Sequence, residues 1–155
     1  MIKYIMIKKI SIKTKFGWLT AFERNGKIFK IKFGKIKKQL KSKPLEKFKK
    51  NLLYFLNKKT SHINAPYKIE GNEIQKKIWL ELKKIKPGHT KSYGEIAKKY
   101  KLSPRHIGKI CSQNKLVLSI PCHRVIKSDG TLGGFSSRGG VGLKKKLLDF
   151  EKLWK

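Results

Sequence analysis

The fold is decided by the stretch Ser92–Val125, which reads SYGEIAKKYKLSPRHIGKICSQNKLVLSIPCHRV. It opens with a helix start, because Ser92 is followed three residues later by Glu95, the spacing of a capping box. Ser103 and Pro104 mark a second start, since serine caps helix N-termini and proline fits the first turn. The stretch therefore predicts two short helices joined by a three-residue turn, which is a helix-turn-helix pattern. Many helix pairs share this pattern and bind nothing.

The predicted helices span residues 92–100 and 104–113. The second has two distinct faces, as expected for an amphipathic helix. Its inward face carries Ile107, Ile110 and Cys111. Its outward face carries Arg105, Lys109 and Ser112. We interpret Cys111 as a residue of the core or of a cavity wall, and not as a second nucleophile.

The end of the stretch carries the candidate chemistry. The apolar run Leu116–Ile120 predicts a short buried strand, which leads into Pro121-Cys122-His123-Arg124-Val125. A cysteine becomes a strong nucleophile only when a neighbouring base or positive charge populates its thiolate. His123 is adjacent, but neighbours in an extended chain point to opposite sides, so a turn at Pro121 or a bridging water has to connect them. An inert core cysteine at position 122 is the alternative.

A carboxylate near the C-terminus is the candidate partner of the histidine. Residues 141–154 predict a helix, and Glu151 lies on its apolar face, four residues after Leu147. A carboxylate there must find a partner, so Glu151 is a candidate for the group that orients the His123 imidazole. The alternative is a partly exposed Glu151 paired with one of the many lysines.

Residues 130–142 hold six of the 13 glycines of the chain. Glycine-rich loops let backbone N–H groups approach a ligand closely. This loop lacks the Gly-Lys-Ser/Thr ending of a phosphate-binding loop. It is a candidate cavity wall, with a flexible connector as the alternative.

The first third of the chain alternates apolar and polar residues, which predicts antiparallel strands with one face on a core. Asn25-Gly26 lies between two such runs and favours a type I′ hairpin turn. Residues 2–34 therefore predict a small antiparallel sheet. Its expected inward residues are Ile10, Ile12, Phe16, Phe29, Ile31 and Phe33.

Helical periodicity then predicts helices over residues 45–57 and 72–86, separated by a polar linker over residues 58–71. Together these elements predict an α+β protein. We expect an N-terminal α/β domain at residues 1–68 and a helical domain at residues 69–155.

The composition permits a polyanionic partner. The 155 residues include 40 Lys and Arg but only nine Asp and Glu, a formal net charge of +31, which excludes a protein with an acidic surface. Only four of the basic residues are arginine, and the lysines are spread almost evenly. The charge is therefore permissive for nucleic acid and does not locate a binding stripe.

Two cysteines cannot form a disulfide framework, which indicates a reducing compartment and a cytoplasmic protein. The four histidines are scattered, so we expect no structural zinc. The N-terminal segment is interrupted by lysines and is not a signal peptide. No stretch approaches the roughly 20 apolar residues of a membrane span.

Taken together, these segments resemble the O6-alkylguanine-DNA alkyltransferases, also called methylated-DNA–protein-cysteine methyltransferases. The active-site signature of that family, Pro-Cys-His-Arg-Val, stands at residues 121–125, and Asn114 precedes it at the spacing of the family. The resemblance covers residues 72–151 closely and the N-terminal part only in its general plan. Further matching positions are Ile74, Gln75, Ile78, Trp79, Leu82, Gly88, the run Ser92–Ala97, Pro104, Arg105, Gly108, the loop 133–136 and the helix 144–151.

The resemblance implies that the sheet is RNase H-like and that the C-terminal domain is a winged helix with a helix-turn-helix. It implies a catalytic set in which Cys122 accepts an alkyl group as a thiolate and His123 takes the thiol proton through water. Glu151 would hold His123, Asn114 would brace the active-site turn, and Tyr93 would help to neutralise the departing guanine.

The same resemblance implies two binding sets. The substrate-binding set contains backbone groups at Cys122 and Val125, the N–H near Ser136, and Lys144 as a support of the cavity, to which we add Cys111. In the DNA-binding set, Arg105 would enter the stack that the damaged nucleotide leaves. Ala97, Gly108, Lys109 and Ser112 would complete this set at the minor groove.

The implied function is direct-reversal DNA repair. An alkyl group would move from O6 of guanine to Cys122. The resemblance leaves open whether O4 of thymine is also a donor. The thioether product cannot be cleaved by any residue here, so we expect one transfer per molecule and no cofactor. The implied partner is double-stranded DNA containing O6-alkylguanine, met by a monomer away from membranes.

The sequence departs from the family in two places. Lys115 and Val117 stand where prolines are usual, and the loop after Gly134 is longer, which leaves the alignment of residues 137–142 open. Two other functions compete. A non-enzymatic DNA-binding protein would explain the charge but not Cys122, and a cysteine hydrolase would turn over repeatedly without DNA.

Overall fold

The computed structural model describes residues 5–154; residues 2–4 of the predicted sheet lie outside that range. The chain divides into two compact units, residues 1–70 and 71–155, each described below by itself. Both sheet and helices are present, so the predicted α+β class is confirmed. Within residues 5–154, no helix combines the length and the apolar character needed to cross a bilayer.

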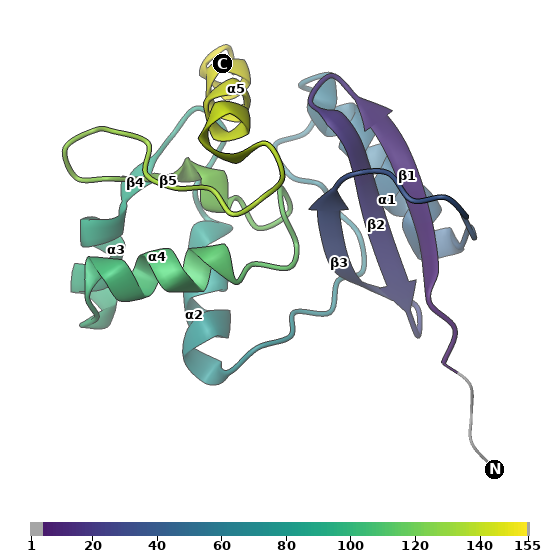
Figure 1. Cartoon of the computed structure of the whole chain (residues 1–155), viewed down its shortest axis with the longest axis horizontal. Coiled ribbons are helices and arrows are strands. Elements are labelled where there is room, and N and C mark those ends of the chain that lie inside the picture. The colour runs from purple at the N-terminus through teal and green to yellow at the C-terminus, as the bar shows by residue number, and fades with distance from the viewer. Residues whose placement is uncertain (1–4, 155) are drawn as a thin grey trace. The chain divides into compact units, whose positions relative to one another are not determined.

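The first unit is a three-stranded sheet with a helix behind it (Figure 1). Strands β1 (Lys8–Thr14), β2 (Gly17–Arg24) and β3 (Lys27–Phe33) are antiparallel in that order. The β2–β3 turn is the expected one, because Asn25 and Gly26 have φ of 54° and 80°, and a type I′ turn needs φ above zero at both. Helix α1 (Lys43–Leu56) is capped by Ser42.

The core of this unit lies between α1 and one face of the sheet. From the helix, the buried residues are Leu45, Phe48, Leu52 and Phe55. From the strands, they are Ile10, Ile12, Leu19, Ala21, Ile28, Ile31 and Phe33. The predicted linker contributes as well, since Ile28 exchanges backbone hydrogen bonds with Pro66 and Lys68 at 2.7 and 2.8 Å, which adds a short pairing to the edge of β3.

Two of the residues predicted to point into the core, Phe16 and Phe29, are not part of it. A β-bulge shifts the β2–β3 register between Phe22 and Glu23. Because a bulge inserts a residue and re-aims the side chains beside it, Ile28 is buried while Phe29 is only half-buried and packs against Phe22. Phe16 lies in the β1–β2 turn, where it is half-buried. The prediction was wrong for Phe29 because strict alternation allows for no bulge.

The second unit is mostly helical. Its elements are α2 (Glu73–Leu82), β4 (Lys91–Ser92), α3 (Tyr93–Tyr100), α4 (Pro104–Ser112), the 3-10 turn η1 (Cys122–Arg124), β5 (Val125–Ile126) and α5 (Gly140–Lys152). Strands β4 and β5 form a short parallel pair. The predicted helix at residues 72–86 ends earlier, at Leu82, and continues as turns. Ser92 and Ser103 cap α3 and α4 as expected.

The predicted strand at Leu116–Ile120 is wrong. The segment is a buried turn, in which Leu118 has a φ of 71° and the backbone N–H of Ile120 donates to the Leu116 carbonyl at 2.9 Å. The Asn114 side chain holds both ends, because its Oδ1 accepts from the N–H of Leu116 and its Nδ2 donates to the carbonyl of Ile120. The apolar residues of the segment are buried as expected. Their backbone is held by the Asn114 side chain and not by a neighbouring strand.

A buried carboxylate joins α2 to α3. Glu81 is 3% exposed, and its carboxylate accepts from Lys99 Nζ at 2.8 Å and from the Tyr100 hydroxyl at 2.7 Å. Lys84 and Lys91 lie within 3.4 and 3.7 Å of it. The hydrogen bond from Lys99 is the largest influence and, with the bond from Tyr100, outweighs burial and lowers the Glu81 pKa to about 2.

Replacing Glu81 with glutamine should reduce stability at neutral pH by roughly 2 kcal/mol, the scale of hydrogen bonds to a charged group. A carboxylate with a folded pKa near 2 and an ordinary pKa of 4.5 stabilises the fold fully above 4.5 and loses that contribution as the pH falls toward 2. Urea unfolding at pH 7, 4.5 and 3 measures both effects. The difference in free energy of unfolding between the native protein and E81Q should become smaller as the pH falls. E95Q changes an exposed position of α3 and should have the same free energy of unfolding as the native protein. A gap that stays constant from pH 7 to 3 would contradict this role of the Glu81 charge.

Candidate active site

Cys122 lies at the start of the turn η1 and is 7% exposed. The Asn114 side chain that closes the preceding turn also reaches it, since Asn114 Nδ2 is 3.2 Å from Cys122 Sγ. One amide group thus binds the backbone of the turn and the sulfur together. We predicted a bracing position for Asn114, and its three contacts with the turn are those of a brace.

Behind the cysteine, three charged or polar side chains form a closed network. His123 Nε2 is 2.8 Å from Glu151 Oε1. Arg124 binds the same carboxylate through Nε at 3.0 and 3.1 Å and through a terminal nitrogen at 2.5 Å, and its other nitrogen donates to the Ile85 carbonyl. These three residues are at most 3% exposed. The structure therefore brings Glu151 to His123, and the alternative of a surface Glu151 paired with a lysine does not hold.

The network fixes the protonation of the imidazole. Burial raises the pKa of Glu151, but the hydrogen bonds from His123 and Arg124 outweigh it and lower this pKa to about 2, so the carboxylate is ionised. Burial lowers the pKa of His123 more than Glu151 raises it. A neutral imidazole beside an ionised carboxylate places its proton on Nε2. Nδ1 then carries a free lone pair, and it is a buried atom with no hydrogen-bond partner among residues 5–154.

The thiol itself rests in its protonated form. Burial raises the pKa of Cys122, and the hydrogen bond from Asn114 and the charge of Lys144 offset this only in part. A protonated thiol is a weak nucleophile, so its proton must leave before or during a reaction. His123, the next residue in the chain, remains the predicted base, and its Nδ1 is free to accept a proton.

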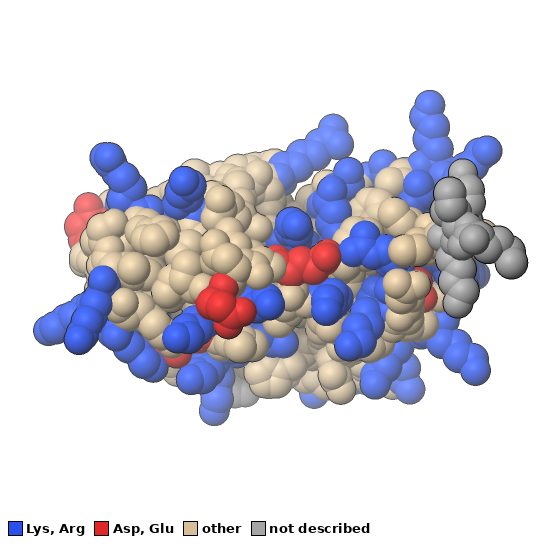
Figure 2. Space-filling model, turned by 90° about the horizontal axis from the view of Figure 1, so that it is seen from below, with Lys and Arg blue, Asp and Glu red and all other residues tan. Residues whose placement is uncertain are grey.

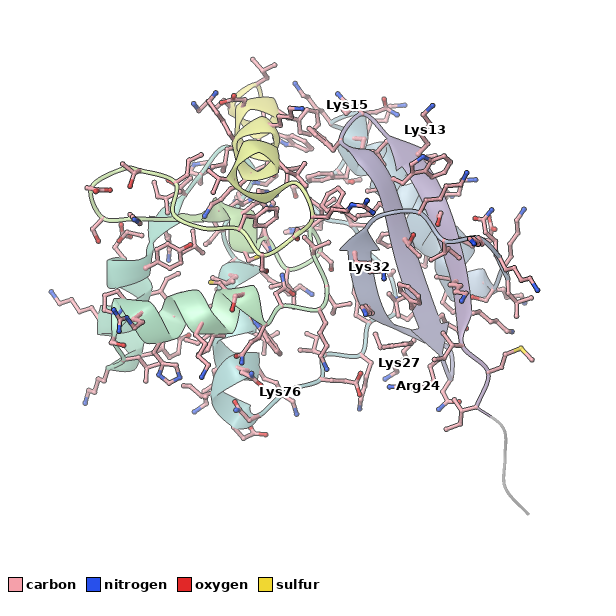
Figure 3. The ribbon with its side chains drawn as sticks, in the orientation of Figure 1. Lys13, Lys15, Arg24, Lys27, Lys32 and Lys76 are labelled. Atoms are coloured by element: carbon pink, nitrogen blue, oxygen red, sulfur yellow. The ribbon has the colours of Figure 1, made fainter. Side chains whose placement is uncertain are left out.

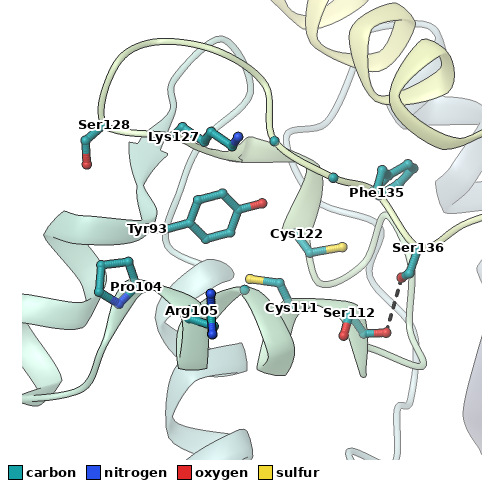
Figure 4. A pocket seen from close by; sticks show the side chains of 13 residues that line it. Tyr93, Pro104, Arg105, Cys111, Ser112, Cys122, Lys127, Ser128, Phe135 and Ser136 are labelled. Carbon is teal, nitrogen blue, oxygen red and sulfur yellow. Dashed lines mark hydrogen bonds between the residues drawn. The ribbon is translucent and has the colours of Figure 1, made fainter.

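Cys122 opens onto a cavity of ≈ 540 Å³ (Figure 4). Helices α3 and α4 supply one side of the cavity, and the segment after β5 with the glycine-rich loop supplies the other. The lining residues are Tyr93, Pro104, Arg105, Gly108, Cys111, Ser112, Cys122, Lys127, Ser128, Gly133, Gly134, Phe135 and Ser136. The loop is closed against α4 by a 3.2 Å hydrogen bond from Ser136 Oγ to the Ser112 carbonyl.

A glycine is required where the loop meets Tyr93. Gly133 has a φ of 73°, and a Cβ atom there would lie 3.1 Å from Tyr93 Cε2. The loop is therefore a packed wall, as expected from its glycines, and the alternative of a flexible connector does not describe this part of it. The Tyr93 hydroxyl points to the side of the cavity where Cys122 lies (Figure 4).

Lys144 of α5 supports this wall from behind. It is fully buried and donates to the carbonyls of Val125 at 2.7 Å and Gly134 at 3.2 Å, and to the Tyr93 hydroxyl at 3.3 Å. Burial lowers the pKa of Lys144, while the nearby thiols raise it. Burial raises the pKa of Tyr93 to about 12, so its hydroxyl keeps its proton and can donate it into the cavity.

Besides Asn114, His123, Lys144 and Glu151, which are described above, three further predicted site residues do not line the cavity. Ala97 is 2% exposed and its side chain is buried in α3, so its contact with DNA stays a prediction. Val125 is completely buried, and its carbonyl already accepts from Lys144. Lys109 is exposed on α4, on a neighbouring hollow that it shares with Arg105.

Sequence reasoning also missed several residues. Arg124 received no role, although it stands inside the five-residue signature and binds Glu151 more extensively than His123 does. Lys127 and Ser128 line the cavity directly after β5. Their place immediately after the signature was the available signal, because residues that follow an active-site turn stay close to it.

The cavity thus joins two features, a pair of capped helices and a buried cysteine that is followed by a histidine. A helix pair of the helix-turn-helix type beside such a cysteine is the arrangement expected of a DNA-binding protein with a cysteine acceptor. A family model described as the DNA-binding domain of 6-O-methylguanine DNA methyltransferase matches residues 73–153. A methylated-DNA–protein-cysteine methyltransferase of Metallosphaera sedula is 34% identical over 149 residues, which cover 94% of this chain and 94% of that relative. The chain belongs to the methylated-DNA–protein-cysteine methyltransferase family.

Solved structures agree in fold. The crystal structure of a Mycobacterium tuberculosis O6-methylguanine methyltransferase superposes with a TM-score of 0.84 at 24% identity, over 97% of this chain and 95% of that chain. A crystal structure of the Mycobacterium tuberculosis protein in complex with DNA gives 0.82 at 25% identity, over 93% and 92% of the two chains.

Proposed function

We propose that this protein repairs DNA by moving an alkyl group from O6 of guanine to Cys122, once per molecule. The observation that carries the proposal is a cavity-lining thiol followed in the chain by a buried histidine whose Nδ1 has no hydrogen-bond partner within residues 5–154. Family membership supports the reaction class, and we propose Cys122 Sγ as the acceptor atom and His123 as the base.

In the proposed reaction, a bond forms between Cys122 Sγ and the alkyl carbon while the bond from that carbon to O6 breaks. The thiol proton moves to His123 Nδ1, through a water molecule, and Glu151 stabilises the charged imidazole. The electrons of the broken bond remain on guanine, which therefore departs as an anion that needs hydrogen-bond donors. The Tyr93 hydroxyl, itself bound by Lys144, is the donor, and the proton returns from His123 to complete the neutral base.

The base reaches the cavity by leaving the duplex. We propose that Arg105, exposed at the N-terminal end of α4 and part of the cavity rim, fills the vacated place in the stack. Gly108 and Ser112 would lie against the DNA, and the backbone N–H near Ser136 would bind the base oxygen. Lysines contribute sequence-independent attraction that salt weakens. Figure 2 shows Lys and Arg side chains scattered over the face that it draws, which suits this general role.

We also retain the finer predictions on architecture and setting. They are an RNase H-like N-terminal domain at residues 1–68, a winged-helix domain at residues 69–155, a monomer and a cytoplasmic location without a cofactor. The two free cysteines, Cys111 and Cys122, support a reducing compartment. The substrate is proposed to be double-stranded DNA that contains O6-alkylguanine.

Incubation with an excess of duplex containing O6-methylguanine should add a single methyl group to each protein molecule. The thioether has no route to cleavage, so uptake should stop at one equivalent however long the reaction runs. Intact-mass and peptide mass spectrometry measure the number of methyl groups and place them on the Cys122 peptide. An unmodified duplex of the same sequence is the control. Uptake beyond one equivalent, or release of the methyl group as a small product, would instead favour a hydrolase.

A further inference from the structure

The open side of the N-terminal sheet carries aromatic rings where strand alternation predicts polar residues. Phe22 lies on the face of β2 opposite the buried Ala21 and Glu23. The bulge beside it turns Phe29 of β3 to the same side, and the two ring centroids are 6.4 Å apart. Both side chains are half-buried and not part of the core.

Cations surround these rings. The Arg24 guanidinium lies 4.3 Å from the centroid of Phe29, and the ammonium groups of Lys30 and Lys32 each lie 5.6 Å from the centroid of Phe22. We name the set Phe22, Arg24, Phe29, Lys30 and Lys32 the sheet platform. Figure 3 shows Arg24, Lys27 and Lys32 along the β2–β3 side of the sheet.

Negative charge is scarce around the platform. Glu23 is the one acidic residue in β1, β2 and β3, which the structure describes in full, and its side chain is buried. Glu70 binds Arg24 at 3.2 and 3.3 Å and holds the guanidinium in place. Residues 1–70 contain 20 basic and three acidic residues. This unit is therefore strongly basic, although the catalytic residues proposed above all belong to the other unit.

Charge alone does not single out the platform, because lysines are spread over the whole chain. Its distinguishing feature is the pair of neighbouring rings among cations. Single-stranded nucleic acids are bound by this combination, in which aromatic side chains stack on unpaired bases and basic side chains hold the backbone. A duplex hides its base faces, and the carboxylate side chains of an acidic peptide offer no ring that could stack on the phenylalanines.

We propose that the sheet platform binds single-stranded DNA, with bases against Phe22 and Phe29 and phosphates against Lys30, Lys32 and Arg24. The choice of DNA over RNA rests on the proposed repair function. The platform lies entirely within the N-terminal unit. It is thus a second DNA contact, separate from the cavity that holds Cys122.

The test compares variants of the full-length protein in binding a fluorescein-labelled 16-nucleotide oligo(dT) by anisotropy. F22L/F29L removes the rings and keeps every charge, and it should weaken binding by roughly fivefold or more, the scale of one lost base–aromatic stack. Y54L is the matched control, since Tyr54 is an exposed ring of α1 with Lys50 at 5.8 Å, and it should bind like the native protein.

A second pair of variants tests the phosphates and guards against misfolding of the first. K30Q/K32Q should lower the slope of log affinity against log salt by about 1.4, as two lost phosphate contacts require for a single strand. K47Q/K49Q removes two exposed lysines of α1 and should change the slope less. Equal losses in both pairs would mean general attraction by lysine and would overturn the proposal. Native affinity of F22L/F29L for the oligonucleotide would also overturn the proposal. The same holds if polyglutamate displaces the labelled oligonucleotide as well as unlabelled oligo(dT) does.

Methyl uptake by the same variants from saturating methylated duplex separates this proposal from the repair function. Weakened strand binding with full uptake on Cys122 supports the platform. Absence of uptake in the native protein would count against the repair function alone, because the strand-binding comparison does not depend on it.

Discussion

Replacing Cys122 with serine should abolish methyl uptake from O6-methylguanine DNA while duplex affinity stays within a fewfold of the native value. Serine fits the space, but its hydroxyl is far harder to ionise than a thiol and is a poor nucleophile toward an alkyl carbon. The Asn114 contact with position 122 can persist, so the turn should keep its shape. Uptake is measured by mass spectrometry, and affinity by anisotropy with an unmodified duplex.

The matched control is C111S, because Cys111 lines the same cavity and has the same chemistry. Burial, together with the neighbouring Cys122, raises the pKa of Cys111 to about 12, so we expect it to remain an unreactive wall residue. C111S should therefore still take up one methyl group. Methylation of Cys111 in the C122S protein would contradict the assignment of a single acceptor, and loss of DNA binding in C122S would question the division between binding and chemistry.

Replacing Glu151 with glutamine should impair both the fold and the reaction. Arg124 would be left as a buried charge without its carboxylate, and removing one partner of a buried pair typically costs about 3–5 kcal/mol. Glutamine can also present its N–H to the imidazole and favour the wrong tautomer, which removes the lone pair from Nδ1. Loss of general-base assistance should slow alkyl transfer by roughly 10²- to 10⁴-fold. Urea unfolding and single-turnover rates at a temperature where the variant is folded measure the two effects.

D149N is the control for this experiment. Asp149 lies two residues earlier on α5 and pairs with Lys145 at 2.7 Å and with Lys152 at 3.4 Å on the surface. Exposed pairs of this kind contribute about 0–1 kcal/mol, so D149N should be close to the native protein in stability and in rate. If E151Q and D149N behave alike, the buried network does not position the histidine.

The sequence was most informative where local rules decide the structure. Serine caps, the Asn25-Gly26 turn and the apolar stripes of the helices depend on residues within one turn of each other, and these elements formed as predicted. The signature around Cys122 also singled out a thiol that lines the cavity, because the five residues are contiguous. For the pair of His123 and Glu151, which are 28 positions apart, the apolar face of the last helix made Glu151 only a candidate, and the family resemblance implied the pairing.

The failures share one cause, which is a partner that the local pattern does not contain. The turn at Leu116–Ile120 was predicted as a strand because its apolar run says nothing about the Asn114 side chain that holds both ends. Phe29 was placed in the core because a bulge is a property of two paired strands.

The shared carboxylate of Glu151 has a consequence for how long a proton can stay on His123. Once the imidazole accepts the thiol proton it becomes a cation beside the Arg124 guanidinium, and the charges of Arg124 and Lys144 both lower the pKa of His123. The carboxylate that stabilises this cation is already bound by Arg124 through several hydrogen bonds. In the proposed reaction we therefore expect His123 to hold the proton only briefly, because burial and the charges of Arg124 and Lys144 all lower its pKa. The proton would then pass to the guanine anion.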